Sequence, residues 1–195
     1  MKIKAAPLKW IVLVACLVAG LGRGTAWADG ANPKCRELKQ KIADIALLHE
    51  QLGDRSRQAQ AAHDALMAQQ DTLAAEINIL VKSLKINSFA EAQQNLRVHY
   101  DIELLRSIFA YITFLDDKIL FYRIGRDKLN YLHDSALDDI EMMRALDDLK
   151  IDALTTQISL VINQYLPEAH AIQIAPGANA LPSPEQVWDR VTRAK

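Results

Sequence analysis

Residues 38–84, LKQKIADIALLHEQLGDRSRQAQAAHDALMAQQDTLAAEINILVKSL, repeat apolar side chains with the seven-residue period of a coiled coil. The d position of this repeat is apolar in seven consecutive heptads, at Leu38, Ile45, Leu52, Ala59, Leu66, Leu73 and Leu80. Alternating steps of four and three residues line up apolar side chains on one stripe of an α-helix, which a partner helix then buries. The segment therefore predicts a long helix, and it indicates an architecture rather than an activity.

Strong helix breakers are scarce well beyond this repeat. Pro is absent from residues 34–166, and Gly occurs there only at positions 53 and 125. Asn32 is a suitable N-cap, and Pro33 suits the first helical position, where its missing N–H costs nothing. We therefore expect an all-α fold, with residues 29–166 forming an elongated helical hairpin or bundle whose first helix ends near Lys85.

The residues after the repeat predict the partner of this helix. Asn87 is suited to end the first helix, and Ser88-Phe89-Ala90-Glu91 is a capping box that begins a second one. Two long helices joined by about two residues lie antiparallel, so the numbers of facing residues sum to about 174. We expect a coiled-coil-like antiparallel hairpin in which apolar positions face one another.

The same register predicts a buried polar layer in which charged side chains of the two helices pair with each other. Its predicted members are Arg55, Ser56 and Arg57 in the first helix and Asp116 and Asp117 in the second.

A second apolar stripe on the second helix needs a further partner, because an exposed stripe of that size favours association. It consists of Ile102, Leu105, Phe109, Ile112 and Ile119. We predict a turn at residues 130–135 and a third helix over about 136–165 that folds back, with Leu154 beside Ile112 and Val161 beside Leu105. In the alternative, the second helix continues to residue 165 and a second protomer covers the stripe.

The C-terminal segment, residues 167–195, is predicted to be a tail that ends in a short amphipathic helix. Pro167 should end the preceding helix, and residues 175–182, APGANALP, should be extended and flexible. Ser183 then caps a helix that carries Val187, Trp188 and Val191. These three side chains either dock on a partner or pack back onto the bundle.

The N-terminal residues predict export. Three lysines precede the apolar run Trp10–Leu21, and Ala26-Trp27-Ala28 resembles a signal-peptidase site, so residues 1–28 read as a cleaved signal peptide. The run is too short to span a bilayer. The residues before Cys16 resemble a lipobox, and lipidation of Cys16 is the less favoured alternative. We expect a periplasmic protein with no transmembrane segment after cleavage.

Cleavage would leave 19 basic residues against 24 acidic ones, a net charge of −5. This balance disfavours nucleic acid and anionic lipid as partners. Cys35 would then be the only thiol of the mature chain. An odd cysteine in an oxidising compartment predicts either an intermolecular disulfide in a homo-oligomer or a free thiol.

Side chains typical of catalysis or metal binding do not gather in the sequence. His49 and His63 lie 14 residues apart on one predicted helix, about 21 Å, which no single ion bridges. We interpret them as polar core positions that set the register. No catalytic triad spacing, phosphate-binding loop or zinc motif occurs. We therefore expect a non-enzymatic protein without a cofactor.

These expectations favour an exported structural or assembly component, or an adaptor, of a bacterial envelope complex such as a secretion, conjugation or surface-structure apparatus. The alternative is a periplasmic chaperone that binds unfolded clients along an aromatic surface of the second helix. That surface would use Tyr100, Phe109, Tyr111, Phe114, Phe121, Tyr122 and Tyr131.

Overall fold

The computed structural model describes residues 33–142, 148–170 and 181–193. These form helices α2 (Pro33–Ser83), α3 (Phe89–Gln94), α4 (Leu96–Met142), α5 (Asp148–His170) and α6 (Pro184–Arg193), with no strand among the described residues. The predicted all-α fold is confirmed. The predicted signal peptide and Cys16 lie outside these ranges.

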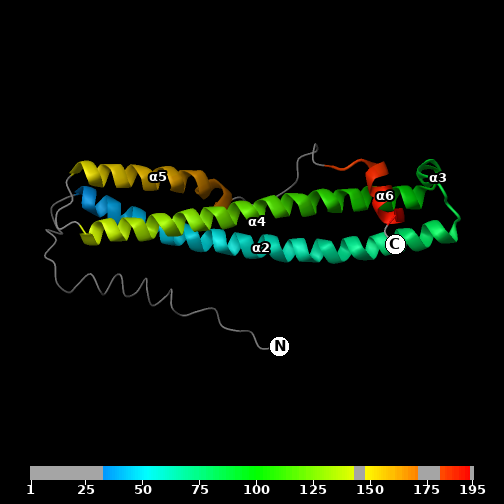
Figure 1. Cartoon of the computed structure of the whole chain (residues 1–195), viewed down its shortest axis with the longest axis horizontal. Coiled ribbons are helices and arrows are strands. Elements are labelled where there is room, and N and C mark those ends of the chain that lie inside the picture. Colours follow the sequence, from blue (N-terminus) through cyan, green and yellow to red (C-terminus); the bar gives the residue numbers. More distant parts are fainter. Residues whose placement is uncertain (1–32, 143–147, 171–180, 194–195) are drawn as a thin grey trace, which may run out of the picture.

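The two longest helices, α2 and α4, run side by side in opposite directions along the whole molecule (Figure 1). Pro33 begins α2, as its fixed backbone angle suits a first helical residue. The helix ends at Ser83, where Lys85 takes a positive φ of 54°. The Ile86 N–H donates to the Val81 carbonyl and the Lys85 N–H to the Lys82 carbonyl, which is a Schellman ending. Lys85 thus has the role that the sequence suggested for Asn87.

The predicted capping box is present, but it begins a helix of only six residues. Ser88 accepts a hydrogen bond from the Glu91 N–H, and Glu91 accepts one from the Asn87 N–H. The short helix α3 ends at Asn95, whose backbone is extended. The Asn95 side chain then accepts a hydrogen bond from the Val98 N–H at 3.2 Å and caps α4. The second helix is therefore split in two.

This break shifts the register between α2 and α4. His63 lies beside Asp116, and an added Cβ on Gly125 would touch Leu52, so facing residues sum to 177–179 rather than 174. The physical reason is that α3 and Asn95 lengthen the connection beyond the two-residue turn assumed from the sequence.

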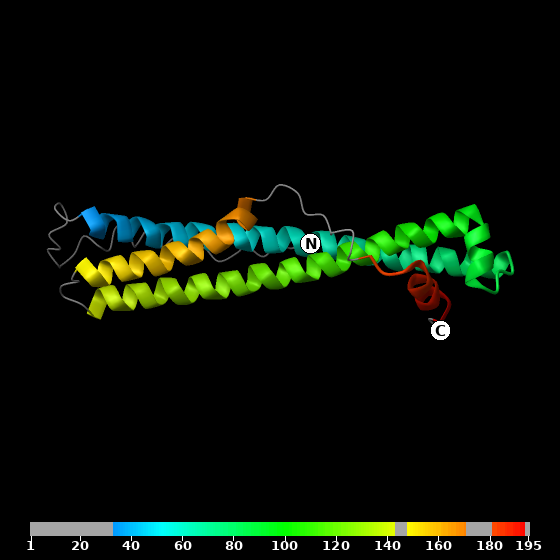
Figure 2. The same ribbon diagram turned by 90° about the horizontal axis from the view of Figure 1, so that it is seen from above.

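One end of the molecule has a three-helix core, here called the base cluster, in which α5 packs against α2 and α4 (Figure 2). Its buried members are Leu38, Ile42, Ile45, Leu48, Leu52 and Ala59 of α2, Leu115, Tyr122, Leu129, Leu132 and Ala136 of α4, and Ile151, Ile158, Ile162, Tyr165 and Ala169 of α5. Lys34 pairs with Asp152 at 2.6 Å and holds the first part of α5 against the start of α2.

The turn predicted at residues 130–135 is not present. The helix α4 continues through residues 130–135 to Met142. Leu129, Leu132 and Ala136 keep this segment on the core, and the Asn130 side chain donates to Asp134 one turn later. Burial of the apolar face thus outweighs the local preference of these polar residues for a turn.

The predicted neighbours of α5 were also wrong. Leu154 and Val161 pack against the base cluster, whereas Leu105 belongs to a separate core. That core, here called the tip cluster, surrounds α6 at the other end of the molecule. Its buried members are Ile77 and Val81 of α2, Ala92 of α3, Val98, Ile102 and Leu105 of α4, and Val187, Trp188 and Val191 of α6.

Between the two cores lies a waist, residues 67–72 of α2 and 110–113 of α4, that belongs to neither cluster. Nearly all of residues 67–72 are exposed. The continuous helices α2 and α4 thus join two separately packed ends.

Pro167 does not end the helix as predicted, because α5 continues to His170. Residues after the proline are anchored: the Arg55 Nε donates to the Ala169 carbonyl at 2.8 Å, and Lys118 pairs with Glu168 at 2.6 Å. The Arg55 contact satisfies one carbonyl of the last turn of α5, where helix carbonyls otherwise lack partners, and the ion pair of Lys118 holds this turn against α4.

Candidate functional site

Large apolar side chains are exposed in a row along the first part of α4. This apolar stripe consists of Leu96, Tyr100, Leu104 and Tyr111, with exposed fractions of 84, 67, 42 and 38%. At 100° per residue, the four positions fall within about 80° of one another around the helix axis. They therefore lie on one face of the helix, with the exposed Ser107 between Leu104 and Tyr111.

The same face of α4 is covered further along the chain by α5. Phe114, Lys118, Phe121 and Gly125 continue the spacing of the stripe. Lys118 pairs with Glu168, and the rings of Phe121 and Tyr165 lie 5.1 Å apart. Because α5 ends at His170, the apolar stripe is the uncovered continuation of a helix-binding face.

The predicted docking residues of the C-terminal helix are buried within the molecule. Val187, Trp188 and Val191 are 0, 8 and 4% exposed. Phe89 packs against the Trp188 ring at 6.4 Å, and the Arg190 guanidinium lies 4.9 Å from the centre of the Phe109 ring. Of the two interpretations of this helix, packing back onto the bundle is the one that the structure has.

Comparison with known proteins assigns no family to the chain. No family model, curated protein or solved structure matches it. None of the described helices is long and apolar enough to cross a membrane. In the ranges 33–142, 148–170 and 181–193, no group of three or more His, Cys, Asp or Glu side chains is placed to hold a metal ion.

The predicted buried polar layer is not formed. Arg55 and Ser56 are half-buried, whereas Arg57, Asp116 and Asp117 are exposed. Arg55 binds the end of α5 as described above, and Arg57 pairs with Asp54 on its own helix. The register shift explains the difference, since it moves the two polar sections past each other.

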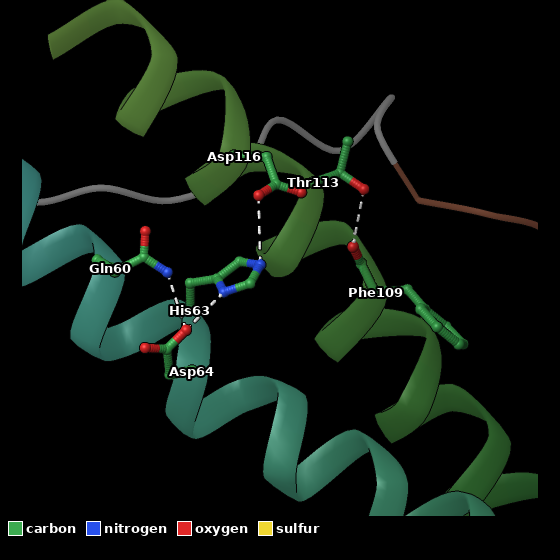
Figure 3. A network of polar contacts seen from close by, with 6 residues as sticks. All are labelled: Gln60, His63, Asp64, Phe109, Thr113 and Asp116. Atoms are coloured by element: carbon green, nitrogen blue, oxygen red, sulfur yellow. Dashed lines mark hydrogen bonds and ion pairs between the residues drawn. The ribbon is translucent and has the colours of Figure 1, made fainter. Parts of the chain in front are cut away.

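Asp116 instead pairs with His63 across the two long helices (Figure 3). The His63 Nε2 lies 3.3 Å from the Asp116 carboxylate, and its Nδ1 lies 3.1 Å from Asp64. A hydrogen bond from Gln60, and then His63 itself, lower the pKa of Asp64. His63 thus joins α2 and α4 next to the waist. The register assumed from the sequence had placed His63 opposite Tyr111, with no cluster of carboxylates there.

The Tyr122 hydroxyl is a buried polar group without a hydrogen-bond partner among the described residues. The side chain is fully buried, and burial raises the pKa of the phenol. An unsatisfied buried hydroxyl costs about 1–3 kcal/mol.

We therefore expect Tyr122→Phe to raise the free energy of unfolding by about 1 kcal/mol, measured by urea denaturation. Tyr131→Phe is the control, because Tyr131 is 72% exposed and should give no change. A lower stability of the Tyr122→Phe variant would contradict the prediction and indicate that the hydroxyl has a partner.

The imidazole of His49 makes stability depend on pH. Burial lowers its pKa, and the positive charges of Arg126 and His133 lower it further, while Asp127 and Glu50 oppose them. The unfolded chain binds a proton near pH 6.5, above the folded pKa. Stability contributed by the neutral ring is therefore lost as the pH falls below about 6.5.

We expect the free energy of unfolding to decrease between pH 7.5 and 5.5 more steeply in the wild type than in His49→Gln. One proton accounts for at most about 1.4 kcal/mol per pH unit. Parallel pH profiles of the two proteins would contradict this assignment.

Cys35 has a free thiol in the structure and is half-buried against the base cluster. The predicted intermolecular disulfide stays a prediction.

From the sequence, Tyr100 and Tyr111 were considered as part of an aromatic surface, but Leu96 and Leu104 were missed, because the heptad register had assigned Leu104 to the face of the second helix that packs on the first. A signal was available in Asn95, since Asn three residues before Val98 is suited to cap a new helix. A break at that position moves the following residues relative to α2 and turns the stripe outward.

Proposed function

We propose that the protein is an exported, non-enzymatic structural or assembly component, or adaptor, of a bacterial envelope complex. In this proposal the chain works as an elongated, coiled-coil-like hairpin that presents the apolar stripe of α4 to a partner protein. In this proposal, residues 1–28 are a cleaved signal peptide that directs export.

The observation that carries the proposal is the exposure of Leu96, Tyr100, Leu104 and Tyr111 on one face. Contiguous apolar surface rimmed by polar residues is typical of protein interaction sites. Tyrosines are also enriched among the residues that dominate binding energy. The neighbouring part of the same face already binds a helix, α5, through Phe121 and Gly125. This continuity favours a helical partner.

The test is site-specific photo-crosslinking in the native envelope. A photo-reactive residue at position 100 should give one discrete crosslinked product, and a second substitution, Leu104→Glu, should abolish it. Position 123 is the matched control, because Arg123 is exposed about 140° away from position 100 around the axis of the same helix. No product from position 100, or identical products from positions 100 and 123, would contradict the proposal.

Export and cleavage of the signal peptide are tested separately, by measuring the mass of the chain recovered from a periplasmic fraction. We expect Asp29 as its first residue. A chain that keeps residues 1–28, or one confined to the cytoplasm, would contradict export.

The chaperone function is the second candidate, favoured by the exposure of Tyr100, Tyr111 and Tyr131. The phenylalanines of α4 support it less, since Phe109, Phe114 and Phe121 are half-buried against the two clusters. In an aggregation assay, a chaperone would protect an unfolded client, and Leu104→Glu would weaken that protection. An assembly component would give no protection in either form.

A further inference from the structure

The helix α6 lies in an apolar groove that α2 and α4 form at the tip. The walls of the groove are Ile77, Val81, Val98, Ile102 and Leu105, each at most 7% exposed with α6 in place. Trp188 is the largest α6 side chain in the groove, with its ring 6.4 Å from that of Phe89, and the Asn78 side chain donates to the Val191 carbonyl at 3.4 Å. The groove therefore holds a short helix by anchors at the spacing i, i+1 and i+4, in the way that helix-binding grooves do.

Only docking keeps α6 helical. It has ten residues, and isolated helices shorter than about 12–15 residues are marginal in water. Its capping box, in which Ser183 and Gln186 exchange hydrogen bonds, begins the helix but does not compensate for that length. Release of α6 is therefore a local opening, which uncovers the groove while the base cluster stays packed.

The chain that connects α5 to α6 is long for the distance between them. Lys118 contacts Glu168, and the Arg106 guanidinium contacts the Pro182 carbonyl. Twelve residues of α4 separate these anchors, about 18 Å along the axis. The twelve residue steps from His170, where α5 ends, to Pro182 can reach roughly 40 Å. A released α6 thus has the length to reach a neighbouring molecule.

We propose that the tip groove is an exchange site, in which α6 of a second copy of this chain replaces the chain's own α6. The α6 helix of a second copy fits the groove because it has the same sequence as the helix that already fills it. A tethered helix has an effective concentration in the millimolar range, so the chain's own α6 occupies the groove in dilute solution. Exchange occurs where copies are concentrated, or where the chain's own α6 cannot dock.

The first experiment adds a fluorescent peptide of residues 181–193 to the full chain and measures fluorescence anisotropy. Trp188→Ala in the full chain removes the largest side chain that α6 places in the groove, so this variant should bind the wild-type peptide at least tenfold more tightly than the wild-type chain does. A peptide that itself carries Trp188→Ala should not bind. Equal binding to both chains, or no binding to either, would overturn the proposal.

The second experiment keeps Trp188 and deletes residues 171–180. Two residue steps, roughly 7 Å, then join His170 to Pro182, which is too short for the chain's own groove. Light scattering should show a dimer, and adding Trp188→Ala to the deletion should return a monomer. A monomeric deletion variant would overturn the proposal. The groove lies apart from the apolar stripe, so this result is independent of the crosslinking at position 100.

Discussion

Leu105→Ala should lower the free energy of unfolding by about 2–5 kcal/mol, while Leu104→Ala should change it by no more than about 0.5 kcal/mol. The two leucines are neighbours on α4, but Leu105 is fully buried in the tip cluster and Leu104 is 42% exposed. Removal of the Leu105 side chain leaves a cavity in the tip cluster, because the other members of the cluster hold one another in place. Urea denaturation followed by far-UV circular dichroism measures both variants.

The pair also separates stability from binding. Leu104→Ala should weaken the crosslink from position 100, whereas its urea midpoint should match the wild type. Equal destabilisation by the two substitutions would mean that Leu104 is covered in solution and that the apolar stripe is not a free surface.

Gly125→Ala should lower the free energy of unfolding by about 1–3 kcal/mol. A Cβ at this position would lie 2.7 and 2.8 Å from two ring carbons of Tyr165 and 3.0 Å from Leu52. Real Cβ atoms do not approach carbon so closely, so the Tyr165 ring and α5 would have to move away from α4. The gain in helix propensity from Gly to Ala, about 1 kcal/mol, offsets only part of this loss.

Gly53→Ala is the matched control. Its Cβ would lie 3.4 Å from the Arg126 Nε, which is the end of a flexible side chain that can shift. The propensity gain then dominates, and stability should stay level or rise by up to about 1 kcal/mol. If Gly125→Ala behaved like Gly53→Ala, the close approach of Tyr165 to α4 would be wrong.

The heptads of residues 38–84 predicted the long first helix because burial of a regular apolar face dominates over so many turns. Pro33 and the Ser88 capping box predicted two helix starts correctly, since each depends on local backbone geometry. These elements could be predicted because their causes lie within a few residues in the sequence.

The register could not be predicted in the same way. It depends on the conformation of one residue, Asn95, whose side chain caps α4 and extends the connection. The shift of three to five residues placed Asp116 beside His63 and left Leu104 exposed. Capping of a new helix at Asn95, instead of continuation of the preceding helix, thus determined which surface of α4 is exposed.

The turn before α5 was predicted in the wrong place because long-range packing outweighs the local composition there. Residues 130–135 have the polar composition of a break, but Leu129 and Leu132 are buried in the base cluster and hold the helix together. The coverage of Ile102 and Leu105 was likewise assigned to the wrong helix, because α6 is short and its contacts lie far from it in the sequence. Long-range packing decided both cases.

Because the waist lies between the base and tip clusters, the length of the molecule can change there without a change in the packing of either cluster. Insertion of seven residues into α2 at 67–72, matched by seven in α4 at 110–113, would lengthen the molecule by about 10 Å and return every later side chain to its original face. The chain from Glu168 to Pro182 has enough residues to follow that extension. Such a molecule is a spacer whose span changes in whole heptads while both of its ends keep their contacts.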